Sequence, residues 1–197
     1  NGQIININYI SSLNFRIARQ KIGCSAKVIE DIIDYPDNTI YNTLIVSPPG
    51  CGKTTLLRDI IRNLSNGIKS MNFSGKNIGV VDERGEIAAM YKGIPQNDVG
   101  IRTDIIDNMP KPEAMRLLVR SMAPDIIACD EIGSYEDVKA IDYAMCSGVK
   151  GIFTAHGRDM EELSQNPEIS KLLNKHTFER IIFLNSRKRG DTECVYI

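Results

Sequence analysis

The stretch SPPGCGKTT, residues 47–55, decides the fold of this chain. The apolar run NTLIVS at residues 42–47 predicts a buried strand before it, and apolar side chains at helical spacing predict a helix over residues 53–65 after it. A loop that contains Gly-Lys-Thr between a strand and a helix is typical of phosphate binding. The alternative interpretation is a Gly/Pro turn beside an exposed lysine.

The residue types of this loop suit the phosphates of ATP. Gly50 and Gly52 let backbone N–H groups approach phosphate oxygens, and Lys53 can reach the β- and γ-phosphates. Thr54 offers a hydroxyl to Mg²⁺. Ser47 departs from the strict pattern GxxxxGK[ST], which has glycine at that position. We expect the nucleotide to be bound by Pro49, Gly50, Cys51, Gly52, Lys53, Thr54 and Thr55.

The rest of the chain alternates short apolar strands with helices. Strands are predicted at 42–47, 77–82, 125–129 and 150–155, and helices at 53–65, 112–122, 135–147 and 168–176. Residues 178–184 and 192–197 predict a C-terminal β-hairpin around Arg189-Gly190-Asp191. This alternation predicts an α/β P-loop NTPase fold, RecA-like, with a mostly parallel sheet flanked by helices.

The amino-terminal part gives weaker signals. The first ten residues could supply an edge strand, and a helical stripe is predicted through Leu13, Ile17 and Cys24. A second helix is predicted from Ala26 to Ile33, and Tyr35-Pro36-Asp37-Asn38 predicts a turn.

Composition excludes several classes of protein. The 197 residues carry a net charge of -1, with 42% hydrophobic and 25% charged residues, which excludes disordered and collagen-like chains. This balance argues against nucleic-acid binding through a bulk positive field. The five cysteines are scattered without a CxxC pair, so neither a disulfide framework nor a zinc knuckle is expected, and a reducing cytosol is the simplest compartment. With two histidines, any metal needs mainly oxygen ligands.

Two acidic clusters follow apolar strands. DIIACDE at 125–131 fits a Walker B element, with Asp130 in the Mg²⁺ shell and Glu131 orienting the attacking water, although the pair could instead cap the next helix. VVDERGE at 80–86 places Asp82, Glu83 and Glu86 at the carboxyl edge of the sheet, where α/β sheets bind ligands. There the alternative is ordinary surface charge, neutralised by the intervening arginine.

Cationic and histidine side chains complete the candidate site. His156 follows the strand at 150–155 and suits a γ-phosphate sensor, although a lone histidine is more often structural. Arg102, Arg116 and Arg120 are candidates for an arginine finger, but such residues more often form surface salt bridges.

Five blocks of sequence, in order, resemble the family of stage III sporulation protein AA, which is related to type II/type IV secretion ATPases. They are SPPGCGKTTLLRD, VVDERGEIA, GIPQNDVGIRTD, RSMAPDIIACDEIGSYEDV and TAHG. The resemblance implies an acidic box at Asp82, Glu83 and Glu86, and a histidine box that ends at His156. It thereby adds Glu83 and His156 to Lys53 and Glu131 as catalytic candidates.

The resemblance also implies a biological role. It points to a Mg²⁺-dependent ATPase, with ATP and Mg²⁺ as cofactors, that powers or gates a secretion-like channel during endospore formation. A homo-oligomer, typically a hexameric ring, is implied, with other stage III sporulation channel proteins as partners. The implied location is cytoplasmic, on the mother-cell side, and peripheral to the membrane around the forespore.

The chain departs from its relatives in two ways. Asp130 stands where many secretion ATPases have glycine, which makes the Mg²⁺ site resemble that of a general P-loop ATPase. The chain is also shorter than is usual for the family. We therefore interpret residues 1–35 as a remnant of an N-terminal domain or an interdomain connector, and residues 36–197 as the ATPase domain.

Other functions stay open. Arg187-Lys188-Arg189, together with Arg16, Arg19 and Lys21, favours a nucleotide-dependent switch or nucleic-acid-binding module, although direct nucleic-acid binding is not our main expectation. A small-molecule kinase is less favoured, since no arginine-rich lid is evident. Cys51 lies beside helix-initiating N–H groups and Lys53, so its thiol is a candidate for selective alkylation.

Overall fold

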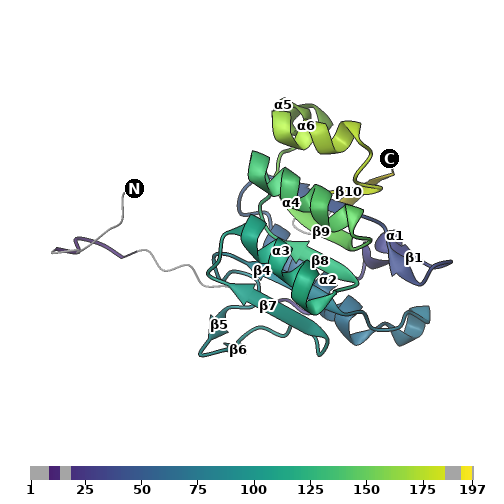
Figure 1. Cartoon of the computed structure of the whole chain (residues 1–197), viewed down its shortest axis with the longest axis horizontal. Coiled ribbons are helices and arrows are strands. Elements are labelled where there is room, and N and C mark those ends of the chain that lie inside the picture. The colour runs from purple at the N-terminus through teal and green to yellow at the C-terminus, as the bar shows by residue number, and fades with distance from the viewer. Residues whose placement is uncertain (1–8, 14–18, 185–191, 197) are drawn as a thin grey trace.

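The computed structural model describes residues 9–13, 19–184 and 192–196. Its centre is a seven-stranded sheet (Figure 1). The strand order is β11 (Thr192–Tyr196), β10 (Arg180–Leu184), β3 (Thr43–Ser47), β9 (Lys150–His156), β8 (Ile126–Cys129), β4 (Ile78–Asp82) and β7 (Thr103–Asp107). All neighbouring pairs are parallel except β10 and β11.

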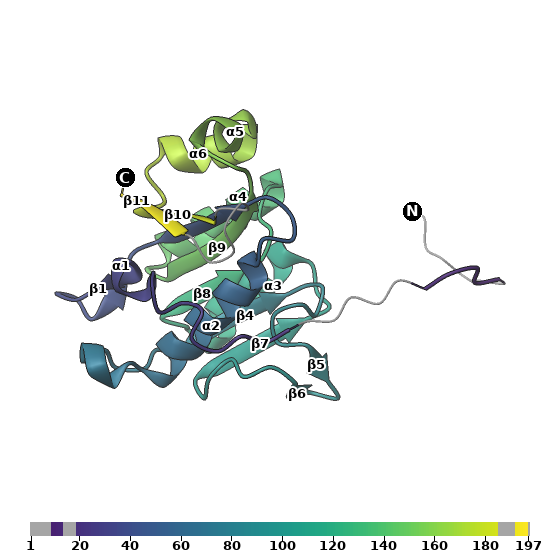
Figure 2. The same ribbon diagram turned by 180° about the vertical axis from the view of Figure 1, so that it is seen from behind.

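Helices cover both faces of this sheet. One hydrophobic core joins alternate strand residues, such as Ile45, to α1 (Ile29–Ile32) and α2 (Lys53–Asn66). The other core joins the opposite set, such as Leu44, to α3 (Lys111–Met122), α4 (Tyr135–Cys146), α5 (Met160–Gln165) and α6 (Pro167–Asn174). Figure 1 shows α4 in front of the sheet, and Figure 2 shows α2 on the reverse side. Because β3 is buried on both faces, its sequence is a continuous apolar run rather than an alternating one.

Smaller elements lie at the periphery. A 3₁₀ turn (Lys69–Met71) follows α2. The strands β1 (Ile33–Asp34) and β2 (Thr39–Ile40) pair antiparallel, as do β5 (Met90–Tyr91) and β6 (Ile94–Pro95). The predicted turn at 35–38 joins β1 to β2, with Asn38 in the left-handed region at φ +46°.

The predicted fold class is confirmed, including the C-terminal antiparallel strand pair, while some local predictions are wrong. The structure adds β7, β5, β6 and α5, none of which the sequence pattern predicted. The predicted tip of the C-terminal hairpin lies outside the described residues.

The amino-terminal predictions need correction. Residues 9 and 10 form no strand, and residues 19–24 are irregular up to Lys21 and form turns from Ile22 onward rather than the end of a helix. Gly23 has a φ of +83°, which a helix does not accommodate. The second predicted helix shrinks to Ile29–Ile32, whose Ile29 and Ile32 are buried in the core with α2. The remaining positions of both predictions, 1–8 and 14–18, lie outside the described residues.

Candidate nucleotide-binding site

The phosphate loop connects β3 to α2 at the carboxyl edge of the sheet. Gly50 and Gly52 have φ values of +75° and +98°, a region that glycine enters without strain. No side chain caps the first turn of α2, whose N-cap residue is Gly52. The unpaired N–H groups of that turn, together with the helix dipole, provide a binding surface for an anion.

Lys53 folds back over this loop. Its Nζ donates to the carbonyl of Ser47 at 2.9 Å and to that of Pro48 at 3.4 Å, and lies 3.1 Å from Nδ1 of His156. Ser47, in place of the usual glycine, is buried, and its hydroxyl donates to the Pro48 carbonyl at 2.8 Å. The serine therefore fits inside the loop, and the lysine ammonium lies within it.

A pair of oxygen ligands suitable for Mg²⁺ lies beside the loop. The hydroxyl of Thr54 donates to Oδ2 of Asp130 at 2.6 Å, which brings the two predicted metal residues together. The other carboxylate oxygen, Oδ1, accepts from the hydroxyl of buried Thr154 on β9. Among the described residues, no group of three or more His, Cys, Asp or Glu side chains is arranged to hold a metal. The oxygen pair fits Mg²⁺, which keeps several waters and binds few protein ligands.

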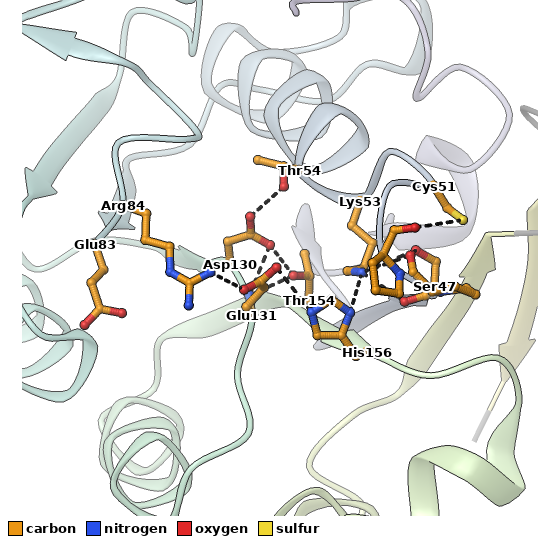
Figure 3. Close-up of polar contacts among 12 residues, drawn as sticks. Ser47, Cys51, Lys53, Thr54, Glu83, Arg84, Asp130, Glu131, Thr154 and His156 are labelled. Atoms are coloured by element: carbon orange, nitrogen blue, oxygen red, sulfur yellow. Dashed lines mark hydrogen bonds and ion pairs between the residues drawn. The ribbon is translucent and has the colours of Figure 1, made fainter. Parts of the chain in front are cut away.

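Glu131 lies next to this pair in a strained backbone conformation. Its φ is +50°, which is uncommon for a residue other than glycine and often accompanies a functional role. Its N–H donates to Thr154 Oγ1 at 2.8 Å, and its carbonyl accepts from Lys111 Nζ at 2.6 Å. Its carboxylate contacts His156 Nε2 at 3.2 Å and Arg84 Nη1 at 2.8 Å (Figure 3).

The acids of the 80–86 cluster separate into different roles. Asp82 is buried, and its carboxylate accepts from the N–H groups of Ile87 at 3.0 Å and Ala88 at 2.8 Å. Asp82 therefore holds its own loop in shape. Glu83 lies 3.6 Å from Lys111 Nζ, and Glu86 lines the cleft beside the phosphate loop. All three flank a small cavity of about 20 Å³ that Asp130 and Glu131 also line.

These groups surround a cleft of about 390 Å³. That volume falls within the range of small-molecule sites. Its walls are the phosphate loop and the start of α2 on one side, and the loop after β4 with Glu131 and His156 on the other. The lining residues are Arg19, Pro49, Gly50, Gly52, Lys53, Thr54, Thr55, Arg58, Arg84, Gly85, Glu86, Glu131 and His156.

Sequence reasoning missed Arg58, which organises one wall of the cleft. Its guanidinium donates to the carbonyls of Glu86 and Ile87, each at 2.6 Å, and to that of Arg19 at 2.9 Å. Burial lowers the pKa of Arg58 from its ordinary value, while the nearby Asp82 acts in the opposite direction. The helical spacing of α2 does not reveal this role, because the partners of Arg58 are backbone atoms distant in sequence.

The candidate arginine fingers lie away from the cleft. Arg102 Nη1 donates to the Ser65 carbonyl at 3.1 Å, near the far end of α2. Arg116 and Arg120 are exposed on α3. This helix starts at Lys111 beside Glu131, so Arg120 lies about 13 Å further along its axis. Within one chain, none of the three lines the cleft.

Only some of the basic residues behind the nucleic-acid-binding hypothesis lie in the part of the chain that the structure describes. Arg19 and Lys21 are exposed, whereas Arg16 and the run 187–189 lie outside the described residues. Cys51 is half-buried, with its Sγ 3.8 Å from the Pro49 carbonyl.

The fold and loop define the class of P-loop ATPase folds found in secretion and pilus motors. The structure resembles the ATPase DotB of Legionella pneumophila, with a TM-score of 0.57 and 18% identity over 80% of this chain and 43% of that one. It also resembles the pilus retraction motor PilT with bound ADP. The TM-score is 0.56, and the identity is 19% over 85% of this chain and 49% of that one. At these identities the likeness establishes the fold.

The chain belongs to the family described as sporulation stage III, protein AA, whose sequence profile matches residues 1–196. It is 42% identical over 191 residues to stage III sporulation protein AA of Bacillus subtilis (strain 168), covering 96% of this chain and 60% of that protein. The chain is also 33% identical over 168 residues to the uncharacterized protein ycf45 of Cyanidium caldarium. The match covers 83% of this chain and 46% of that protein. The chain thus spans 60% or less of the length of these two relatives.

No helix in the part of the chain that the structure describes combines the length and the apolar character that a membrane span needs.

Proposed function

We propose that this chain is the catalytic core of a Mg²⁺-dependent ATPase. The observation that carries the proposal is the contact between Thr54 and Asp130, directly beside Glu131 and at the head of the helix that begins with Lys53. A metal ligand pair, an acid that can polarise water and an anion-binding helix terminus lie around one cleft. Phosphoryl transfer from ATP to water needs this combination.

Each residue has a defined task in this mechanism. The loop N–H groups and Lys53 bind the phosphates. To do so, the Lys53 ammonium gives up its hydrogen bonds to the loop carbonyls and donates to phosphate oxygens instead. Thr54 and Asp130 would hold Mg²⁺, which when bound would neutralise charge on the phosphates. Thr154 fixes the orientation of Asp130.

Glu131 orients water and accepts its proton. His156, which already contacts both Glu131 and Lys53, is placed to sense the γ-phosphate. Glu83 acts from outside the cleft by holding Lys111, which also binds the Glu131 carbonyl.

Family membership and the fold shared with secretion and pilus ATPases support a proposal about the larger context. We propose that the ATPase powers or gates a secretion-like channel in endospore formation, as a ring of identical subunits, hexameric in arrangement. It would act with other stage III sporulation proteins on the cytoplasmic, mother-cell side, peripheral to the membrane around the forespore. Arg102 and Arg120 would then act across subunit boundaries. Residues 36–197 form the ATPase domain in this proposal, and residues 1–35 its connection to a preceding domain.

Phosphate release by the purified chain, with ATP and Mg²⁺, tests the proposal. Lys53→Ala and Glu131→Gln are each expected to lower the rate by a factor of about 100 or more. Glu131→Gln should still bind a fluorescent ATP analogue, since it removes the water-activating group and leaves the loop intact. Lys139→Ala and Glu162→Gln, at exposed positions, are the matched controls and should retain the wild-type rate.

The outcomes separate the hypotheses. Equal hydrolysis by wild type, Lys53→Ala and Glu131→Gln would refute the proposed mechanism. Tight nucleotide binding by wild type without any turnover would favour the nucleotide-dependent switch.

A further inference from the structure

Four side chains form a continuous chain of contacts across the cleft. Lys53 Nζ lies 3.1 Å from His156 Nδ1, and His156 Nε2 lies 3.2 Å from one oxygen of Glu131. The other Glu131 oxygen accepts from Arg84 Nη1 at 2.8 Å. All four line the same cleft, with a cation at each end of the chain (Figure 3).

This arrangement occupies both oxygens of the water-activating carboxylate. Each carboxylate oxygen has a second lone pair, but a donor bound to the carboxylate competes with water for its negative charge, so Glu131 accepts a proton from water more readily once one of its two partners has left. The Arg84 side chain is 61% exposed, whereas that of His156 is 49% exposed and is also in contact with Lys53. Arg84 is thus the partner with more freedom to leave.

The backbone that carries Arg84 is held firmly. Gly85 N donates to the Asp82 carbonyl at 3.1 Å, and the Asp82 carboxylate binds the N–H groups of Ile87 and Ala88. Arg58 additionally binds the carbonyls of Glu86 and Ile87. A fixed backbone with an exposed, long side chain allows the guanidinium to change partner without movement of the loop.

Resting on the proposed ATPase function, we propose that Arg84 is a catalytic residue that exchanges partners during each cycle. Without nucleotide, it pairs with Glu131. When ATP binds, its guanidinium moves to the terminal phosphate, whose several charged oxygens compete strongly for a planar, two-pronged donor. The exchange leaves a Glu131 oxygen free at the moment when substrate is present.

The chemical step then balances without a covalent role for Arg84. The water oxygen forms a bond to the γ-phosphorus, the bond from that phosphorus to the bridging oxygen of ADP breaks, and Glu131 accepts the water proton. Arg84 stabilises the negative charge on the transferred group, and this role, where it occurs, is worth about 10³–10⁵ in rate.

The test compares Arg84→Ala and Arg84→Gln with a matched control, Arg158→Ala, at an exposed arginine paired with Glu162 on α5. Steady-state hydrolysis, affinity for ADP, and affinity for ADP with aluminium fluoride are measured on the full chain. We expect both Arg84 variants to lose a factor of about 100 or more in kcat. ADP affinity should change less than about threefold, while affinity for the transition-state mimic falls roughly in parallel with kcat. Free guanidinium should partly restore Arg84→Ala and leave Arg158→Ala unchanged.

Three results would overturn the inference. An Arg84→Ala rate equal to or above that of wild type would mean that the arginine merely restrains Glu131. A lower rate with unchanged preference for the fluoride complex would make Arg84 a positioning residue that acts through Glu131. In either case an active wild type keeps the proposed function intact, whereas a wild type no faster than Lys53→Ala overturns both proposals.

Discussion

Asp59 on α2 anchors the amino-terminal segment at residues 19–28 to the helix that begins at the phosphate loop. Its Oδ2 accepts from the Ser25 N–H at 2.8 Å and the Ser25 hydroxyl at 2.7 Å. Its Oδ1 accepts from the Gly23 N–H at 3.1 Å and from Arg62 Nη2 at 2.9 Å. Asp59 is 4% exposed, so these donors depend on it rather than on water. Replacement by asparagine preserves the shape and removes one acceptor oxygen.

The cost of Asp59→Asn follows from this arrangement. Whichever way the new amide turns, its NH₂ group faces donors, and one backbone N–H, of Gly23 or Ser25, loses its acceptor. Losing a buried hydrogen bond to a charged group, together with the unpaired donor, amounts to about 3 kcal/mol of unfolding free energy. Part of the Arg62 guanidinium is accessible to water, which limits its share of the loss.

The pH dependence gives a second, independent signature. Burial alone would raise the pKa of Asp59, but hydrogen bonds from Ser25, Arg62 and Gly23 outweigh it and hold the pKa below its ordinary value of 3.8. A lowered folded-state pKa provides stability above the unfolded pKa that is lost as pH falls through the folded value. Wild type should therefore lose stability more steeply than Asp59→Asn below about pH 4.

Urea unfolding at pH 7 and at several acidic pH values measures both effects. Asp104→Asn, on the exposed side of the edge strand β7, is the control and should change stability by less than about 0.5 kcal/mol. Trypsin should cut after Arg19 and Lys21 faster in Asp59→Asn, because the segment at residues 19–28 opens locally. A stability loss below about 1 kcal/mol at pH 7, with an unchanged acid slope, would refute the anchoring role.

Two further predictions concern the nucleotide and the assembly. ATP or ADP should slow alkylation of Cys51, which lies in the phosphate loop, and should leave alkylation of the exposed Cys146 at the end of α4 unchanged. Mass spectrometry of the Cys51 peptide measures the labelling. Equal labelling of Cys51 with and without saturating nucleotide would contradict the loop assignment. A non-hydrolysable ATP analogue should shift a full-length version of the protein from smaller species to a ring in size-exclusion chromatography with light scattering, whereas a strict monomer would favour the switch hypothesis.

The sequence predicted the buried parallel strands and missed the edge strand β7. The strands β3, β8 and β4 are apolar runs because both faces are covered. By contrast, β7 is Thr-Asp-Ile-Ile-Asp, partly exposed throughout, and its charged residues are typical of an edge. Such a segment has neither the alternation nor the continuous apolar character on which a prediction from sequence depends.

The amino-terminal helix was mispredicted for a different physical reason. Leu13, Ile17 and Cys24 fit helical spacing. The local preference for a helix, however, competes with hydrogen bonds to side chains that are distant in sequence. The carboxylate of Asp59 and the guanidinium of Arg58 bind the backbone of residues 19–25 across separations of 34 to 39 residues. Those bonds favour turns over a helix, and no local window of sequence contains them.

The two strand-end aspartates show that a position after an apolar strand does not by itself determine what an acid contacts. Asp82 and Asp130 both follow apolar strands, yet Asp82 binds its own loop while Asp130 binds Thr54. Sheet order explains the difference. From the phosphate-loop strand β3, the order runs β9, β8, β4, so Asp130 after β8 is one strand nearer than Asp82 at the end of β4.

Asp130 also adjoins Thr154 on β9, whose hydroxyl turns its carboxylate toward the phosphate loop. Asp82 has no such donor in β8: Val81 is aligned with Cys129, so the residue next along, opposite Asp82, is Asp130, whose carboxylate accepts hydrogen bonds and does not donate them. Its carboxylate instead meets N–H groups that its own loop presents after the turn at Gly85. The strand neighbour thus determines which of two similar acids faces Thr54, and a Thr154→Val substitution would remove that distinction while leaving both acids in place.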